Sequence, residues 1–228
     1  MSHYAIGDIH GCLTALTGLV ERLPLTRDDT LVLLGDYVDR GPDSKGVIDY
    51  LLDYAGPAKL ITLRGNHEVM MLDARDNAER FFAWQHFGGE ETLYSYQYTT
   101  GADWQASIPI EHWQFLENTL PYYEADSQIF VHASVKPKRP LDEQDDRHLY
   151  WKKVSKPRPY HSDHRVICGH TTQYDGEIGD HEHTLLIDTY AYGDQWLTCL
   201  NADTLEYWQA NQQGETRQGQ LRHSDQDE

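Results

Sequence analysis

Three short segments of the sequence combine glycine with residues that can bind metal ions or transfer a proton. They read GDIHG at positions 7–11, GDYVDRG at positions 35–41 and RGNHE at positions 64–68. Asp8 and His10 are two residues apart, so in an extended segment both side chains point to the same side. A carboxylate beside an imidazole suits Mn, Fe, Zn or Mg, and no cluster of cysteines competes for a softer metal. The first segment therefore predicts a chelating pair.

Each of these residues on its own has an ordinary structural explanation. A single Asp after a strand is most often a helix cap, and a single His is most often a solvated or hydrogen-bonded side chain. Three such segments at one place are different, because unpaired carboxylates that cluster cost free energy unless a cation is present. The pattern indicates a metal-dependent site if the fold brings the segments together.

The elements around the three segments predict that the fold brings them together. Each segment follows a short apolar run, at residues 4–6, 31–34 and 60–63, which the pattern predicts to be a strand. Between these runs, apolar residues recur every three to four positions over residues 13–23 and 47–52, which predicts helices. Alternation of this kind is typical of a parallel α/β sheet, whose ligands bind beyond the carboxyl ends of the strands. We therefore expect the three segments to meet along one edge of the sheet.

The rest of the chain predicts a helical region and a second sheet. Residues 66–121 are expected to be mostly helical, with their aromatic residues in the core. The second half is expected to be rich in antiparallel strands and to form a sheet packed on the first. Its predicted strands lie at residues 122–124, 129–131, 166–168, 185–187, 196–200 and 205–208, with a long polar stretch at 136–164. We expect one catalytic domain over residues 1–210 and a polar, disordered tail over residues 211–228.

Composition restricts the class of partner. The chain has 228 residues, with 19 Lys and Arg against 37 Asp and Glu, and a formal net charge of −18. Such a chain is expected to bind neither nucleic acid nor an anionic membrane, because both require basic residues to neutralise phosphate. The three cysteines are scattered, and none has an arginine six positions later, which excludes the cysteine-dependent phosphatase mechanism. Without a basic, apolar leader or a long apolar run, the expected location is the cytoplasm.

The three segments and two later ones together resemble a known family. The later ones are Val131-His132-Ala133 and Gly169-His170-Thr171. In order and spacing, the five blocks are similar to the signature blocks of the calcineurin-like metallophosphoesterases, and specifically to those of the phosphoprotein phosphatases. The segment WQHFGG at 84–89 also resembles small bacterial and phage members of that branch. The resemblance implies an α/β fold of two packed mixed β-sheets flanked by helices, a four-layer αββα sandwich.

The resemblance also implies a role for particular residues. It implies two divalent metal ions, with Mn²⁺ expected first and Fe, Zn or Mg as alternatives. The implied metal ligands are Asp8 and His10 on one ion, Asp36 between the two ions, and Asn66, His132 and His170 on the other. The implied groups at the substrate phosphate are Arg40, Arg64 and Asn66, with Lys153 in place of a third arginine. His67 is implied as the proton donor and Asp39 as the residue that orients it.

The implied reaction is hydrolysis of a phosphate monoester by in-line attack of a metal-bridging hydroxide. Asp39 and Arg64 favour a serine/threonine protein phosphatase acting on a phosphorylated protein or peptide, or on a small phosphate ester, with phosphotyrosine as an alternative. A second hypothesis is a hydrolase of diadenosine or other nucleoside polyphosphates, since such enzymes open with a similar GD-x-HG block. A third is an inactive scaffold that binds phosphorylated partners. A panel of phosphopeptides and nucleotides would separate these hypotheses.

Overall fold

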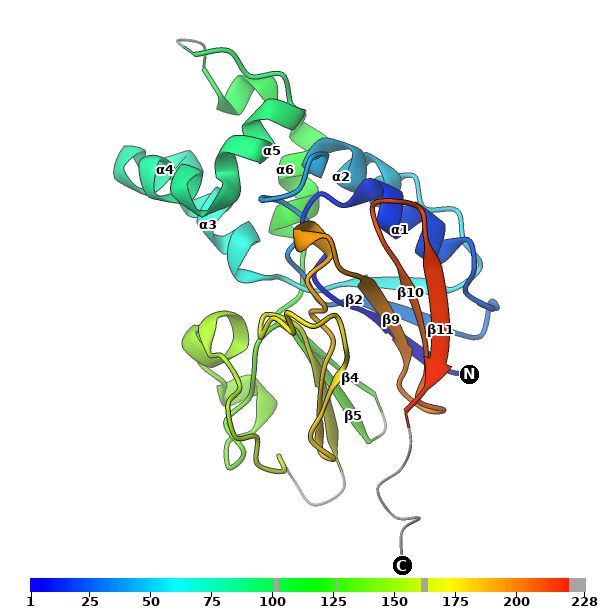
Figure 1. The fold of residues 1–228 in the computed structure, drawn as a ribbon. Helices are drawn as coiled ribbons and strands as arrows, with labels where there is room; N and C mark the ends of the chain where they lie inside the picture. The colour runs from blue at the N-terminus through cyan, green and yellow to red at the C-terminus, as the bar shows by residue number, and fades with distance from the viewer. Residues whose placement is uncertain (101–102, 126, 161–163, 222–228) are drawn as a thin grey trace, which may run out of the picture.

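Two β-sheets lie face to face in the structure, which is a computed structural model that describes residues 1–100, 103–125, 127–160 and 164–221. The first sheet has the strand order β11-β10-β9-β1-β2-β3, and the second has the order β4-β5-β6-β8-β7. Figure 1 shows the second sheet beside the first, with the helices gathered at one end of the molecule. The predicted α/β fold of two mixed sheets with flanking helices is confirmed.

The first sheet begins with the three strands that the apolar runs predict. β1 (His3–Ile6), β2 (Thr30–Leu33) and β3 (Lys59–Thr62) pair in parallel. Helices α1 (Leu13–Val20) and α2 (Ser44–Leu52) connect them, as the spacing predicts. Because the three strands are parallel, the loops that follow them leave the sheet at the same edge.

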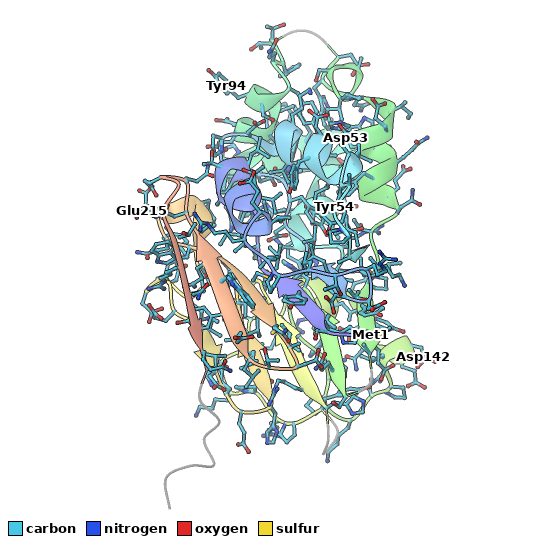
Figure 2. All side chains as sticks on the ribbon, turned by 90° about the vertical axis from the view of Figure 1, so that its right-hand side faces the viewer. Met1, Asp53, Tyr54, Tyr94, Asp142 and Glu215 are labelled. Carbon is cyan, nitrogen blue, oxygen red and sulfur yellow. The ribbon has the colours of Figure 1, made fainter. Side chains whose placement is uncertain are left out.

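The helical region after β3 is also confirmed. It consists of α3 (Asn66–Asp76), α4 (Ala78–Trp84), α5 (Glu90–Ser95) and α6 (Ile110–Glu117), with short helical turns at Gln85–Gly89 and Gln105–Ser107. Figure 2, turned by 90°, shows these helices at one end of the molecule and the strands running toward the other. None of the described helices is both long and apolar enough to cross a bilayer.

The second sheet differs from the expectation of a mainly antiparallel half. Its strands are β4 (Tyr122–Ala125), β5 (Gln128–Val131), β6 (Arg165–Cys168), β7 (Gly179–Asp180) and β8 (Thr184–Leu186). The central strands β5, β6 and β8 are parallel, and only the edge strands β4 and β7 are antiparallel to their neighbours. The loops after β5 and β6 therefore also share one edge.

The last three strands extend the first sheet instead of the second. β9 (Leu197–Asn201) pairs antiparallel with β1, β10 (Glu206–Ala210) pairs with β9, and β11 (Thr216–Gln220) pairs with β10. The expectation that disorder begins at residue 211 is wrong for residues 211–221, because main-chain pairing with β10 orders β11 and Leu221 packs against buried apolar residues. The rest of the predicted tail, residues 222–228, lies outside the described residues, and the single catalytic domain stays a prediction.

Three apolar layers hold the elements together. One lies between the first sheet and the helices, and a second lies between the two sheets, where Val32 and Leu34 pack with Phe130 and Ile167. A third covers the outer face of the second sheet, where the short turns Leu141–Glu143 and Arg147–Trp151 take the place of long helices. The fourth layer of the expected sandwich is thus reduced to short turns at that face.

Candidate metal centre and phosphate site

The predicted metal-binding residues all follow strands at the facing edges of the two sheets. Asp8 and His10 follow β1, Asp36 follows β2, and Asn66 opens α3 just after β3. From the second sheet, His132 follows β5 and His170 follows β6. Five of the six are buried, and His170 is half-buried. Residues that are 162 positions apart, Asp8 and His170, are joined here by hydrogen bonds from the His170 amide to both carboxylate oxygens of Asp8, at 3.1 and 3.0 Å.

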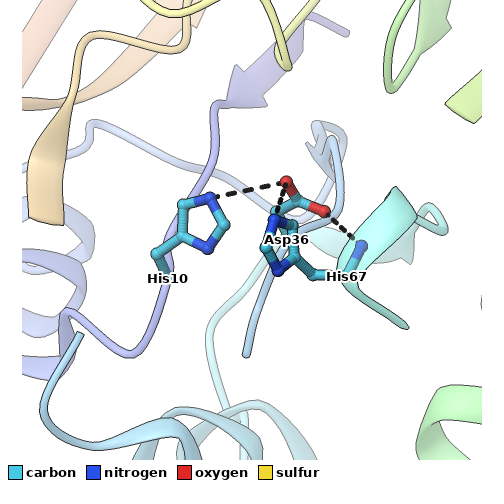
Figure 3. A group of neighbouring side chains, drawn as sticks. All are labelled: His10, Asp36 and His67. Atoms are coloured by element: carbon cyan, nitrogen blue, oxygen red, sulfur yellow. Dashed lines mark hydrogen bonds and ion pairs between the residues drawn. The ribbon is translucent and has the colours of Figure 1, made fainter. Parts of the chain in front are cut away.

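Asp36 stands between two groups of potential ligand atoms. His10, Asp36 and His67 form one group and Asp36, His132 and His170 the other, with the ligand atoms of each group within 4.8 Å of one another. Figure 3 shows the first group, in which His10 Nε2 lies 3.4 Å from Asp36 Oδ2. In the second group, His132 Nε2 lies 3.5 Å from Asp36 Oδ1. One carboxylate thus faces both groups, one oxygen toward each.

The two groups of potential ligand atoms around Asp36 are called the centre below. The hydrogen bonds of His10 and His132 fix which ring nitrogen faces this centre. His10 Nδ1 lies 2.9 Å from the Val38 carbonyl, and His132 Nδ1 lies 2.9 Å from the Leu34 carbonyl. A carbonyl can only accept, so each Nδ1 carries the proton and each Nε2 of the neutral ring presents a lone pair. Burial lowers the pKa of both histidines, which keeps them neutral.

The resulting set of acceptors fits a cation. The Nε2 lone pair of His132 faces the Oδ1 atom of Asn66 at 3.0 Å as well as the Asp36 carboxylate. Burial, together with the charges of Asp188 and Asp36, raises the pKa of Asp8 well above its usual range. Buried acceptors that converge without a proton between them repel one another, and divalent cations relieve this repulsion. Nitrogen and oxygen donors of this kind suit Mn, Fe, Zn or Mg.

His67 and Asp39 form a buried pair beside the first group. His67 Nδ1 lies 2.6 Å from Asp39 Oδ2, while His67 Nε2 is buried without a hydrogen-bond partner, 4.0 Å from Asp36 Oδ2. Burial alone lowers the pKa of His67, but the negative charges of Asp36 and Asp39 and the hydrogen bond to Asp39 raise it above its ordinary value. The pair can therefore hold a proton on the atom that faces the centre.

Asp39 is itself held by two residues from the helical region. Trp84 Nε1 donates to its carboxylate at 2.9 Å, and Thr92 Oγ1 donates at 2.7 Å. The spacing of the aromatic residues in α4 predicts that Trp84 is buried, and it is 1% exposed. The same spacing does not predict the hydrogen bond from Trp84 to Asp39.

Glu68 fixes the loop that carries Asp36. Its carboxylate accepts hydrogen bonds from the amides of Gly65, Asp36 and Tyr37, each at 2.8 Å. Gly65 is required here, because a Cβ atom at this position would lie 2.1 Å from Asp36 Oδ1. Glu68 stands in the RGNHE segment, but no function was predicted for it from the sequence. Its position on the first turn of α3, facing the ends of two strands, is the signal that could have identified it.

Left-handed backbone is concentrated at this centre. His10, Asp36, Asp39, Arg40 and His170 have φ angles of 45°, 53°, 73°, 69° and 57°. Non-glycine residues avoid this region, and each such residue costs of order 1–3 kcal/mol. The surrounding contacts hold these residues in strained conformations, as is common at functional sites.

The three predicted phosphate-binding cations lie in different surroundings. Arg40 Nη1 lies 3.0 Å from His10 Nε2 and donates to Tyr192 Oη at 3.1 Å, so its guanidinium is already at the centre. Arg64 instead donates to Thr119 Oγ1 at 2.9 Å and to the Glu117 carbonyl at 2.7 Å, at the end of α6. Lys153 is exposed. Its charge adds to the effect of burial, which lowers the pKa of the nearby His170 to about 4.

Asp188 was not singled out as a site residue. It follows β8 at the same edge of the second sheet, is 1% exposed, and accepts from Thr172 Oγ1 at 2.7 Å. Burial raises its pKa. Its signal in the sequence is a carboxylate directly after the apolar run at residues 185–187, similar to the position of Asp8 after the run at residues 4–6.

Comparison with known proteins agrees with this geometry. The sequence model of the family described as calcineurin-like phosphoesterases matches residues 1–202. The symmetrical bis(5'-nucleosyl)-tetraphosphatase of Pseudomonas putida is 33% identical over 138 residues, which cover 60% of this chain and 43% of that protein. Serine/threonine-protein phosphatase 1 of Salmonella typhimurium is 35% identical over 113 residues, which cover 48% of this chain and 43% of that protein. The match thus spans less than half of each relative's length.

A solved structure shares the fold at low sequence identity. The cold-active protein-tyrosine phosphatase of a Shewanella species superimposes with a TM-score of 0.65 at 16% identity, covering 95% of this chain and 80% of that one. The match of the family model over most of the sequence shows the family directly. The chain therefore belongs to the calcineurin-like phosphoesterases, a metal-dependent family of phosphoester hydrolases.

Proposed function

We propose that the protein is a phosphomonoesterase of the phosphoprotein phosphatase type, with two divalent metal ions, that acts on phosphoserine or phosphothreonine in a protein or peptide. The observation that carries this proposal is the buried His67–Asp39 pair, with its unpartnered Nε2 atom facing Asp36. A serine or threonine alkoxide is a poor leaving group, so hydrolysis of its phosphate ester requires a positioned acid.

Asp8, His10 and Asp36 would hold one ion, and Asp36, Asn66, His132 and His170 would hold the other. Mn²⁺ is the expected ion, with Fe, Zn or Mg as alternatives. When bound, such ions polarise the phosphoryl group and lower the pKa of water. The opposed Asp36 oxygens, the fixed histidine lone pairs and the raised pKa of Asp8 support this arrangement.

The chain's own residues would bind the phosphate and move the proton. Arg40 would donate to the phosphoryl oxygens after its Nη1 atom leaves His10 Nε2, the atom that would hold the ion, with Asn66 and Lys153 as further contacts. Arg64 would contribute after its guanidinium leaves the carbonyl groups at the end of α6. His67 would donate its Nε2 proton to the leaving oxygen, and Asp39 would hold the ring in the required orientation.

The test is hydrolysis of two substrates that differ in their leaving group. With added Mn²⁺, the wild type should hydrolyse both p-nitrophenyl phosphate and a phosphoserine peptide. His67→Gln should lower kcat for the peptide by about 10²–10⁴-fold and should affect p-nitrophenyl phosphate far less, because nitrophenolate leaves without a proton. Equal loss on both substrates, or no hydrolysis by the wild type, would contradict the proposal.

A second function is favoured by the names of the relatives. Several are symmetrical bis(5'-nucleosyl)-tetraphosphatases. The two functions separate on kcat/KM measured for a phosphoserine peptide and for diadenosine tetraphosphate in the same Mn²⁺ buffer. A preference for the nucleotide by the wild type, with little effect of His67→Gln, would establish the second function in place of the first.

A further inference from the structure

The positive charge of this acidic protein is concentrated in one part of the sequence. Residues 136–160 contain eight Lys and Arg against four Asp and Glu, whereas the other 203 residues contain eleven against thirty-three. Half of these eight cations lie within seven positions, at Lys152, Lys153, Lys156 and Arg158. A local excess of positive charge in a chain of net charge −18 requires an explanation.

These four cations line a cavity of about 200 Å³ on the outer face of the second sheet. Its floor is apolar and includes Val166 and Cys168 of β6. All four cations are exposed, and among the described residues none of them is ion-paired with a carboxylate. Asp145, an acid close to the cavity, is engaged by Lys136 and His148. The cavity thus has basic walls whose charge is not compensated within the described residues.

Hydrogen bonds join the segment beside the cavity to the loop that carries His170, a member of the second group of predicted metal ligands. The Trp151 carbonyl accepts from His170 Nε2 at 3.1 Å, and the Val154 amide donates to Thr171 Oγ1 at 2.9 Å. Two lining residues, Ser134 and Cys168, each stand two positions from a predicted metal ligand, His132 and His170. The cavity therefore lies next to the loops that carry His132 and His170.

We propose that this cavity binds a second phosphoryl group of the same substrate. The inference rests on the proposed function, because it requires the first phosphoryl group to lie at the metal centre. A phosphoryl group carries a charge of about −1.5 to −2 and three acceptor oxygens, which suits several lysines that act as point charges. The cavity is smaller than the ~300–1,000 Å³ of pockets that enclose drug-sized ligands, which favours a compact anion over a nucleobase.

The experiment compares substrates with one and two phosphoryl groups. The peptide arm uses a phosphoserine peptide, the same peptide with a second phosphoserine one to three residues away, and the same peptide with glutamate at that second position. The nucleotide arm uses adenosine 3',5'-bisphosphate against adenosine 5'-monophosphate, so that a phosphate ester is broken in both. The two arms distinguish a doubly phosphorylated peptide from a nucleotide with two phosphoryl groups as the source of the second group.

The variants remove two cavity cations that the metal centre does not use. In Lys156→Met/Arg158→Gln, the ratio of kcat/KM for the two-phosphoryl substrate to that for its one-phosphoryl partner should fall about tenfold, as expected for the loss of two exposed, charge-assisted contacts. The matched control is Arg27→Gln/Lys59→Met, which makes the same change in net charge at two exposed residues away from this edge of the sheets. It should leave the ratio unchanged, and all variants should melt within about 2 °C of the wild type.

Each outcome decides the inference separately from the proposed function. Hydrolysis of p-nitrophenyl phosphate by the wild type, with no advantage for a second phosphoryl group at any spacing in either arm, would overturn the inference alone. An equal advantage for the glutamate peptide would also overturn it, since the cavity would then accept any acidic side chain. If the control variant lowers the ratio of kcat/KM values equally, the advantage reflects the net charge of the protein and not the cavity, and the inference is also overturned. Absence of all hydrolysis would instead refute the proposed function.

Discussion

The loops of the first sheet and the segment 152–158 beside the second sheet hold their charges in opposite ways. In the loops, Asp36, Asp39 and Glu68 are buried and are fixed by hydrogen bonds from the backbone, from a tryptophan and from a threonine. In the segment, Lys156 and Arg158 are exposed and line an open cavity. Fixed, buried anions suit permanently bound cations, whereas exposed cations suit an anion that arrives and leaves with each turnover.

Asp36→Asn tests the buried side of this comparison most severely. The amide cannot present an oxygen to both groups of ligands, so we expect kcat/KM for p-nitrophenyl phosphate to fall by more than the 10–100-fold typical of a residue that only supports a ligand. Metal content measured after dialysis should fall with it. The matched substitution Asp28→Asn, at an exposed residue, should change neither quantity. Full activity of Asp36→Asn would remove the basis for a shared carboxylate.

Asp39→Asn sharpens the comparison by removing one buried negative charge at nearly unchanged side-chain size. It removes the charge that helps to raise the pKa of His67. In the wild type, His67 stays protonated above its ordinary pKa of about 6.5, so the kcat for a phosphoserine peptide should decline only at a pH above that value. In the variant, the decline should move to lower pH, and kcat should fall by about 10–100-fold. A pH profile with an unmoved alkaline limb would contradict the assigned positioning role.

Glu68→Gln should have a smaller effect on the same loops. The amide would turn its NH₂ group or a single oxygen toward three backbone amides that now share a carboxylate. We expect metal affinity to weaken by about 10-fold, at the lower end of the range for such supporting residues. Titration of Mn²⁺ against activity measures this, with Glu21→Gln at an exposed position as the control. Unchanged affinity would show that the loop is held without Glu68.

Lys153→Met should have the smallest effect and should test the exposed side. The loss of one exposed cation is expected to raise KM about 2- to 5-fold at low salt and to leave kcat unchanged. Because exposed charges are screened, the difference from the wild type should shrink between 0.05 and 0.5 M salt. The effect of Asp36→Asn should persist over the same range. A salt-independent effect of Lys153→Met would place this lysine in a buried contact.

The sequence predicted best where the determinants are local. Asp8, Asp36 and Asn66 each lie two or three positions after an apolar run, so strand position and residue type were enough to bring them to one edge. The partners of Asp39 were not accessible in this way, because Trp84 and Thr92 lie 45 and 53 residues further along the chain. The orientation of Arg64 likewise depends on the end of α6, 55 residues away at Thr119.

Strand pairing across the chain was the other limit. A period of two identifies β9 and β10 as strands, but it does not say which sheet edge accepts them, and β9 pairs with β1 nearly 200 residues away. β11 was missed because it is held by main-chain hydrogen bonds to β10 and by the Arg217 guanidinium, which lies 4.6 Å from the centre of the Trp196 ring. Neither contact requires the apolar residues that identify a strand in a sequence.

The apolar layer between the sheets affects the geometry of the centre, although none of its residues lies there. His10 and Asp36 belong to loops of the first sheet, whereas His132 and His170 belong to loops of the second, so the spacing of the two ligand groups depends on how the sheets are seated on each other. Phe130, Ile167 and Val32 in that layer set this seating. A misplacement of about 1 Å can cost ~10²-fold in rate. A substitution in this layer that changes side-chain volume would therefore shift the two ligand groups relative to each other and lower the rate, although no ligand is replaced.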